Sequence, residues 1–174
     1  MDLDVTLAPE EYLEAAIRFC NISDTLNDDW KIIIDEENPH KSYLIKNTFV
    51  TQDTNGPKLC KAELVIFYNL HYGVPAFSFN IWNSSGVLLT LDEIREMTFV
   101  KIKEKDFYTV ITQQEHPLFS RPYFVMHPCH TAELIHMFKN SSNNIIVTFL
   151  GLITPLLNIN LPMGYGVSDV KDIT

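Results

Sequence analysis

A cysteine between two histidines is the residue of this sequence best suited to nucleophilic chemistry. The local order is His127-Pro128-Cys129-His130-Thr131. Pro128 fixes φ directly before the thiol, and Thr131 can cap a helix that begins just beyond it. A thiol near a helix N-terminus meets partial positive charge that favours the thiolate, and a neighbouring imidazole can add to this effect or move protons. The pattern predicts a reactive thiol on the turn that leads into a helix.

The other two cysteines and the flanking histidines have simpler interpretations. Cys20 and Cys60 each continue a periodic apolar pattern, so we expect both thiols in the core, where free cysteine behaves as a small hydrophobe. By spacing alone, Cys129 could be buried in the same way. His127 and His130 beside Cys129 also suggest a metal site, but neighbouring residues rarely point to one centre, and the sequence has no CxxC pair. We therefore expect no metal and no cofactor.

Composition and charge limit the class of protein. The chain has 174 residues and 46% of them are hydrophobic, which fits one folded domain spanning residues 1–174. Its formal net charge of −9 argues against a nucleic-acid binder, which would normally carry a basic face, and against binding to anionic membranes. Proteins with basic surfaces remain suitable partners.

Two stretches bear on where the protein would be found. Residues 1–12 are acidic and lack the apolar core of a signal peptide. The most apolar run, residues 145–157, contains Pro155 and falls short of the roughly 20 residues that span a bilayer. Together with an odd number of widely spaced cysteines, these features predict a cytoplasmic protein with free thiols and no transmembrane segment.

The elements that would position the thiol follow an α+β order, in which helices pack against an antiparallel sheet. The clearest β signal is a hairpin over residues 59–70 and 74–83, and the clearest helix signal is a capping box from Thr90 to Glu93. The expected helices cover residues 7–20, 91–103, 131–140 and 144–156. The other expected strands cover residues 30–34, 43–50, 107–112 and 123–126, with loops at 21–29 and 113–122.

The segment that ends in the cysteine resembles a known signature. Residues 109–131, TVITQQEHPLFSRPYFVMHPCHT, are similar to the signature of the autophagy-related protein ten family of conjugating enzymes. The resemblance extends to YNLHYGVPAFSF at residues 68–79, to LLTLDEI at 88–94 and to TPLLNINLPMGY at 154–165. The QQEHP and HPC elements together are specific to this family, whereas HPC alone is shared with the sister enzyme of lipid conjugation. The first sixty residues match only in general character.

The resemblance implies a fold and an activity. The fold would be that of ubiquitin-conjugating enzymes, a central antiparallel sheet flanked by helices. Cys129 would accept the C-terminal glycine of a ubiquitin-like modifier, autophagy-related protein twelve, as a thioester from an activating enzyme, autophagy-related protein seven. It would pass the modifier to a lysine of autophagy-related protein five, forming an isopeptide bond. In this family no separate ligase is required, and the activating enzyme spends the ATP.

Three side chains are candidates for assisting Cys129. His127 could shuttle protons, or it could simply hydrogen-bond the turn. Tyr68 and Tyr72 lie on the hairpin, which in the implied fold packs near the cysteine. A hydroxyl there could donate to an oxyanion or orient the lysine, although both could also be core residues. Ordinary ubiquitin-conjugating enzymes carry His-Pro-Asn several residues upstream, whereas here His127 and Pro128 lead directly into Cys129, which leaves the oxyanion donor unassigned.

Other classes of protein remain open from the sequence. A non-catalytic adaptor of the same fold would have a buried or absent cysteine. A cysteine hydrolase would need a base near Cys129, and the candidates are His40, His71, His116 and His136, although His116 beside a proline is more simply a turn residue. The sister lipid-conjugating enzyme would normally carry a long acidic insertion, which this chain lacks.

Two surface hypotheses concern partners. One strand of the hairpin within residues 59–83 could present an exposed edge to which the acceptor adds a strand. An acidic stretch is more simply a solvated loop and strand end than a docking site. That stretch consists of Asp28, Asp29, Asp35, Glu36 and Glu37.

Overall fold

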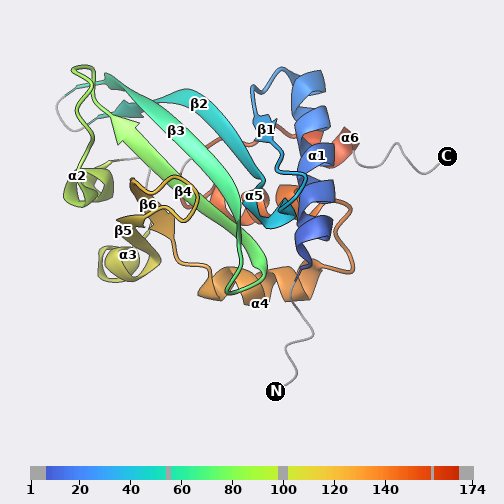
Figure 1. The fold of residues 1–174 in the computed structure, drawn as a ribbon. Helices are drawn as coiled ribbons and strands as arrows, with labels where there is room; N and C mark the ends of the chain where they lie inside the picture. The colour runs from blue at the N-terminus through green and yellow to red at the C-terminus, as the bar shows by residue number, and fades with distance from the viewer. Residues whose placement is uncertain (1–6, 54–55, 98–101, 158, 169–174) are drawn as a thin grey trace.

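A computed structural model of the chain describes residues 7–53, 56–97, 102–157 and 159–168. Its centre is a six-stranded antiparallel sheet with strand order β1-β2-β3-β4-β6-β5 (Figure 1). The long central pair forms because β-branched and aromatic residues alternate through both strands, with only a short turn between them. The strands are β1 (Lys31–Ile33), β2 (Tyr43–Gln52), β3 (Lys58–Asn69), β4 (Val74–Trp82), β5 (Ile111–Glu115) and β6 (Pro122–Met126).

Helices cover one face of this sheet and close its lower end. Figure 1 shows α5 behind the sheet, α1 along its side, and α4 under the turn that joins β3 to β4. Their apolar faces and the sheet bury a single large core that includes Phe19, Phe77 and Phe149. The helices are α1 (Pro9–Leu26), α2 (Leu91–Glu96), α3 (Glu104–Val110), α4 (Cys129–Phe138), α5 (Ile145–Ile153) and α6 (Gly164–Ser168), with a 3-10 turn at Pro39–Lys41.

The predicted α+β architecture, a central antiparallel sheet flanked by helices, is confirmed. The hairpin appears as β3 and β4, with Phe67 opposite Ala76 and Asn69 opposite Val74 in the register. Thr90 caps α2 as predicted, because its hydroxyl accepts the Glu93 N–H at 3.2 Å while the Glu93 carboxylate accepts the Thr90 N–H at 2.7 Å.

Several predicted elements differ from those observed. Helix α1 continues to Leu26, through residues expected to form a loop, because Ser23 and the side chains of the last turns still pack on the core. Helix α2 ends at Glu96, well before the expected residue 103, and residues 98–101 of that range lie outside the described residues. The strand expected over 107–112 is mostly helix α3, since helical spacing buries Phe107; β5 then runs from Ile111 through residues expected to be a loop.

The hypothesis that a hairpin strand offers an exposed edge is wrong. Strand β3 is paired with β2 on one side and β4 on the other, and β4 is paired with both β3 and β6. The outermost strands of the described sheet are β1 and β5. The error arose because a hairpin signal in the sequence identifies a pair of strands and says nothing about what pairs with its outer edges.

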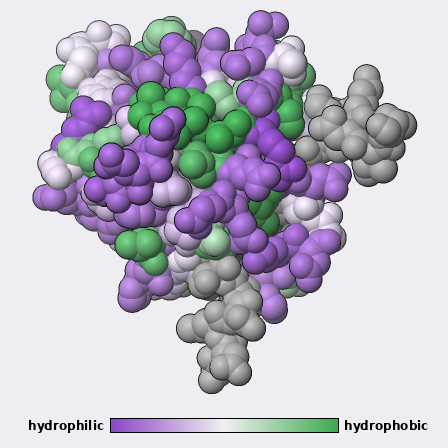
Figure 2. Space-filling view, turned by 45° about the vertical axis from the view of Figure 1, so that its right-hand side comes forward, coloured by the Kyte–Doolittle hydropathy of each residue, from purple (hydrophilic) through white to green (hydrophobic). Residues whose placement is uncertain are grey.

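Members of the acidic stretch are engaged within the fold. Asp28 forms an ion pair with Lys46 at 2.6 Å and accepts the Tyr165 hydroxyl at 2.7 Å. Asp35 accepts the Asn38 N–H at 2.9 Å, which, as the main cause, lowers the pKa of its carboxyl. Glu36 and Glu37 are exposed. Figure 2 shows polar side chains over most of the face it presents, with hydrophobic patches between them.

Candidate active site around Cys129

The three cysteines occupy two different environments. Cys20 and Cys60 are buried, as the sequence predicts, and burial raises the pKa of both thiols. The Cys20 thiol also donates to the Trp30 carbonyl at 3.4 Å. Cys129 is exposed. It is therefore the cysteine that a partner protein can reach.

Cys129 is the first residue of α4, and the buried Pro128 precedes it at the N-cap position. The helix expected over residues 131–140 thus begins two residues earlier than predicted, and Thr131 lies inside the first turn instead of capping it. Pro128 explains this start, because its fixed φ suits the beginning of a helix and it has no N–H to leave unpaired. The thiol consequently sits at the N-terminal end of a ten-residue helix, the end that carries partial positive charge.

His127 is bound to the backbone of the cysteine that follows it. Its Nδ1 accepts the Cys129 N–H at 3.2 Å, and this bond satisfies one of the free N–H groups at the start of α4. Since Nδ1 must offer its lone pair, the neutral ring carries its proton on Nε2. The imidazole is exposed, so Nε2 is the ring nitrogen that can serve a reacting group.

The same local arrangement occurs a second time in the chain. His116 precedes Pro117, and its Nδ1 accepts the Leu118 N–H at 3.1 Å, as His127 does across Pro128. The environments differ, because His116 is fully buried while His127 is exposed. In both His-Pro pairs the histidine thus stabilises a turn by accepting the N–H of the residue after the proline. Only His127 of these two histidines lies beside a reactive group.

Tyr72 lies against His127, whereas Tyr68 is committed elsewhere. The rings of Tyr72 and His127 meet edge to face with centroids 5.9 Å apart, and the ring of His71 meets Tyr72 at 5.1 Å. The Tyr68 hydroxyl is buried and donates to the Leu7 carbonyl at 2.6 Å. Of the two tyrosines singled out from the sequence, the structure brings Tyr72 to the site and gives Tyr68 a supporting contact.

A mostly apolar cavity of about 260 Å³ adjoins the site. His127 and Thr131, which lie two residues to either side of Cys129, form part of its wall, and apolar side chains of α3, α4, α5 and the sheet form most of the rest, among them Val110, Leu134 and Phe149. The cavity places an apolar surface next to the exposed thiol.

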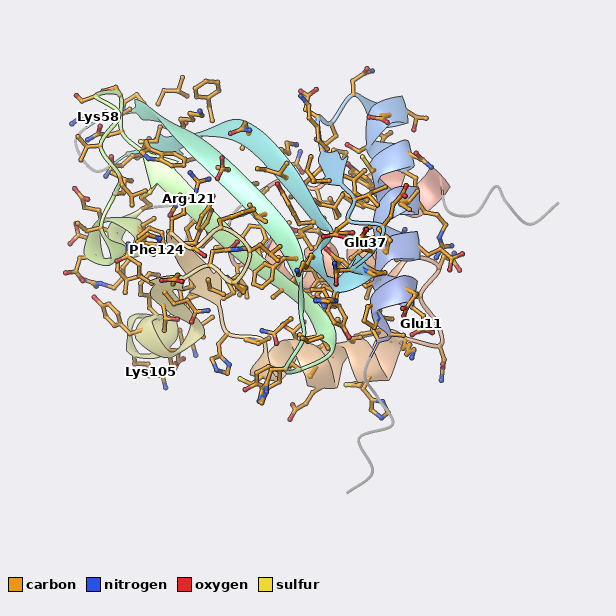
Figure 3. All side chains as sticks on the ribbon, viewed as in Figure 1. Glu11, Glu37, Lys58, Lys105, Arg121 and Phe124 are labelled. Carbon is orange, nitrogen blue, oxygen red and sulfur yellow. The ribbon has the colours of Figure 1, made fainter. Side chains whose placement is uncertain are left out.

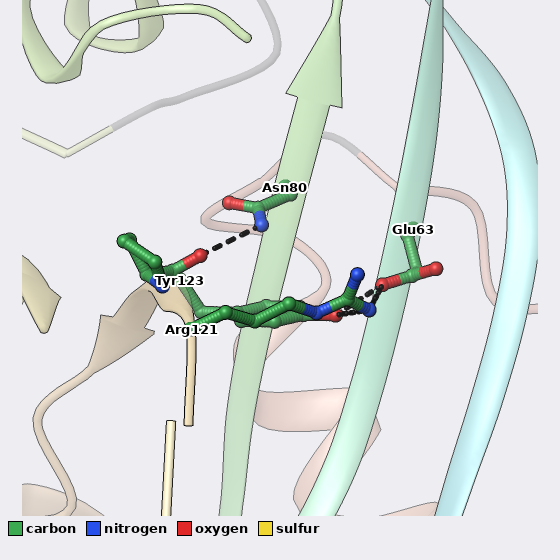
Figure 4. Close-up of polar contacts among 5 residues, drawn as sticks. Glu63, Asn80, Arg121 and Tyr123 are labelled. Atoms are coloured by element: carbon green, nitrogen blue, oxygen red, sulfur yellow. Dashed lines mark hydrogen bonds and ion pairs between the residues drawn. The ribbon is translucent and has the colours of Figure 1, made fainter. Parts of the chain in front are cut away.

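On the far face of the sheet, polar contacts support β6, the strand that leads to His127. Loop 116–121 covers a second, smaller core there that includes Phe67 and Tyr123. Arg121 reaches across this face (Figure 3), and Figure 4 shows it beside Tyr123 and Glu63, with the Tyr123 hydroxyl bonded to the Glu63 carboxylate. Asn80 donates to the Pro122 carbonyl at 2.9 Å. These bonds fix β6 on β4 and thereby fix the position of the segment leading to Cys129.

The sequence left a metal centre and a hydrolase open as alternatives at this site. Within the described residues there is no group of three His, Cys, Asp or Glu side chains that could hold a metal ion. The side chain of His130 lies outside the described side chains. A hydrolase base would be oriented by Asn or Asp, whereas the hydrogen bond of His127 goes to the Cys129 amide. His116 is enclosed by Phe67, Phe119 and Tyr123 on the far face.

The site consists of an exposed thiol at the start of a helix that packs against an antiparallel sheet. The chain belongs to the family described as autophagocytosis associated protein, active-site domain, whose sequence model matches residues 10–163. The matched range contains Cys129, His127 and Tyr72. Within the described residues, no helix is long and apolar enough to cross a membrane.

Curated relatives of the chain carry the name "Ubiquitin-like-conjugating enzyme ATG10". The human protein is 32% identical over 132 residues, which cover 71% of this chain and 60% of the relative. The Arabidopsis thaliana protein is 29% identical over 110 residues, covering 56% of this chain and 49% of the relative. The chain therefore spans about half to three fifths of the length of these relatives.

A solved structure titled "Solution structures of KmAtg10" is also similar. It is 16% identical, with 90% of this chain and 97% of that chain covered and a TM-score of 0.42. Membership of the family rests on the match of the family's sequence model to residues 10–163. The fold class rests on the observed sheet and helices.

Proposed function

We propose that this protein is a ubiquitin-like-conjugating enzyme of autophagy that acts as a single domain over residues 1–174 in the cytoplasm. Cys129 takes the modifier, autophagy-related protein twelve, from its activating enzyme, autophagy-related protein seven. It transfers the modifier to a lysine of autophagy-related protein five without a separate ligase. The observation that carries this proposal is the exposed Cys129 at the start of α4, with His127 bound to its amide, inside the region matched to the family.

Loading is an exchange of thioesters. The Cys129 thiolate attacks the carbonyl carbon of the modifier's C-terminal glycine, and the thiolate of the activating enzyme leaves. The number of thioester bonds is unchanged, so the step needs a nucleophilic thiolate and free access. The position of Cys129 supplies the access, because its side chain is exposed at the start of α4.

Transfer is aminolysis of the thioester on Cys129. A neutral lysine amine of the acceptor attacks the carbonyl and the attacking nitrogen loses a proton to solvent. The tetrahedral oxyanion then collapses, and the Cys129 thiolate leaves as the isopeptide bond forms. His127 assists through Nε2, since Nδ1 is engaged by the Cys129 amide. The Nε2–H can donate to the oxyanion, and proton movement at His127 also passes through this nitrogen. Tyr72 is the tyrosine that supports this step, because its ring lies against His127.

The adaptor interpretation is less consistent with the site. It requires the cysteine to be absent or buried, and Cys129 is exposed.

The reaction that tests the proposal uses purified activating enzyme, modifier, ATP and acceptor with no further protein. The expected product is an acceptor–modifier conjugate that survives thiol treatment. Absence of that conjugate, with the activating enzyme shown to be active on a known partner, would contradict the proposal.

A further inference from the structure

The turn between β3 and β4 is shaped by the side chain of one residue. The Asn69 Oδ1 accepts the Tyr72 N–H at 3.0 Å, while the Asn69 carbonyl accepts the Gly73 N–H at 2.8 Å. Gly73 has φ of +62°, a conformation that glycine adopts without strain. Asparagine at this position therefore fixes the backbone of Tyr72, and the carbonyl bond closes the turn behind it.

The N-terminal segment holds the same turn from outside. The Leu7 N–H donates to the Gly73 carbonyl at 2.8 Å, and the Tyr68 hydroxyl donates to the Leu7 carbonyl at 2.6 Å. Leu7 and Tyr68 are both buried. Leu7 thus bonds to one residue on each strand side of the turn, Tyr68 and Gly73, and burial of Leu7 and Tyr68 in the core fixes the turn relative to the sheet.

What this turn presents to the active site is the ring of Tyr72. That ring meets His127 edge to face, and His127 is itself bonded to the Cys129 amide. A continuous set of contacts therefore runs from Asn69 through Tyr72 and His127 to Cys129. Neither of its two bonds in the turn joins Asn69 to His127 or Cys129, so the influence of Asn69 on the chemistry passes through Tyr72.

We propose that Asn69 is a positioning residue for the transfer step. By fixing the backbone of Tyr72, it holds the tyrosine ring against His127 and limits the orientations of the imidazole that carries the Nε2–H. This inference rests on the proposed conjugating function and adds a residue to it. Small errors in the placement of a reacting group are costly, since a displacement of about 1 Å can slow a reaction about 100-fold. We expect loss of the Asn69 side chain to slow transfer about tenfold, with loading of Cys129 retained.

The variants separate positioning from simple stabilisation. Asn69→Asp keeps an oxygen that can accept the Tyr72 N–H, whereas Asn69→Ala removes it. Asn83 provides a matched control, because its Oδ1 accepts the N–H groups of Ser85 and Val87, both at 3.0 Å, in the turn at the other end of β4. Asn83→Ala makes the same chemical change far from Cys129. Should Asn69→Ala fail to fold, Asn69→Gln displaces the acceptor while keeping an amide in the turn.

The experiment uses the full chain in a single turnover. Cys129 is loaded with the modifier by the activating enzyme and ATP, a chelator then stops further loading, and acceptor is added at several concentrations. Asn69→Ala should lower the maximal transfer rate about tenfold without changing the acceptor concentration at half-maximal rate. Asn69→Asp and Asn83→Ala should transfer like the wild type. In a Tyr72→Ala background, Asn69→Ala should have no further effect.

The results that overturn the inference are distinct from those that overturn the proposed function. Wild-type transfer rates in Asn69→Ala or, if that variant does not fold, in Asn69→Gln would refute the positioning role. An equal slowing in the Tyr72→Ala background would refute it too, because the effect would not pass through Tyr72. If the wild-type protein itself never accepts the modifier, the proposed function fails and the inference falls with it.

Discussion

Lowering the pH from 7 to 4.5 should destabilise the protein through His116. This imidazole is fully buried on the far face of the sheet, in ring contact with Phe67, Phe119 and Tyr123. Burial, together with the charge of Arg121, lowers the pKa of His116 from 6.5 to about 4. Protonation would also place a proton on Nδ1, which accepts the Leu118 N–H in the folded protein.

The size of the effect follows from the two pKa values. Below pH 6.5 the His116 imidazole is protonated in the unfolded chain. In the folded chain it stays neutral until the pH falls to about 4. Stability from this group is therefore complete above pH 6.5 and is lost as the pH falls through that range. Between pH 7 and 4.5 the loss is about 2 kcal/mol.

Urea unfolding of the wild type and of His116→Asn at both pH values measures this loss. The asparagine side chain can still accept the Leu118 N–H but does not titrate, so the variant should lose about 2 kcal/mol less than the wild type on acidification. Contributions from the carboxylates common to both proteins cancel in the difference. Parallel losses in the two proteins would refute the assignment of His116 as a buried neutral imidazole.

Other substitutions have defined outcomes. Asn144→Ala should lower the free energy of unfolding by about 2 kcal/mol in a urea titration, because Asn144 caps α5 and donates to the buried Ala15 carbonyl. His127→Ala should slow single-turnover transfer about 100-fold, the usual loss when one oxyanion donor is removed, and a rate within twofold of the wild type would exclude that role. Tyr68→Phe should cost about 1 kcal/mol in thermal or urea unfolding, since only the bond to Leu7 is lost.

The parts of the fold predicted well from the sequence are those in which local and global preferences agree. The hairpin β3–β4 combines β-branched and aromatic residues with a short turn, and Thr90 with Glu93 forms a capping box that depends only on neighbouring residues. The boundary between α3 and β5 was missed because Phe107 and Ile111 are compatible with either element. There the choice is made by burial of Phe107 and by pairing of Ile111 with Met126, which are tertiary contacts.

The candidate site was predicted only in part, because some of its contacts are local in the sequence and others depend on the tertiary fold. The types and spacing of His127 and Cys129 indicated a reactive thiol, and their mutual hydrogen bond involves residues two apart. Which of Tyr68 and Tyr72 faces the site depends on how the hairpin meets α4 and on the path of Leu7, so the sequence could not distinguish them. Asn69 was missed entirely, although an asparagine before a glycine-containing turn is a signal for a side-chain bond to the backbone.

Trapping of the thioester tests the central claim most directly. The wild type, Cys129→Ser, and the paired controls Cys20→Ser and Cys60→Ser are each incubated with activating enzyme, modifier and ATP and analysed on a non-reducing gel. The wild type and both controls should form an adduct that thiols cleave, and Cys129→Ser should form one that thiols do not cleave. A thiol-sensitive adduct that persists in Cys129→Ser, or a wild type that forms no adduct beside a partner that does, would contradict the assignment of Cys129 as the carrier.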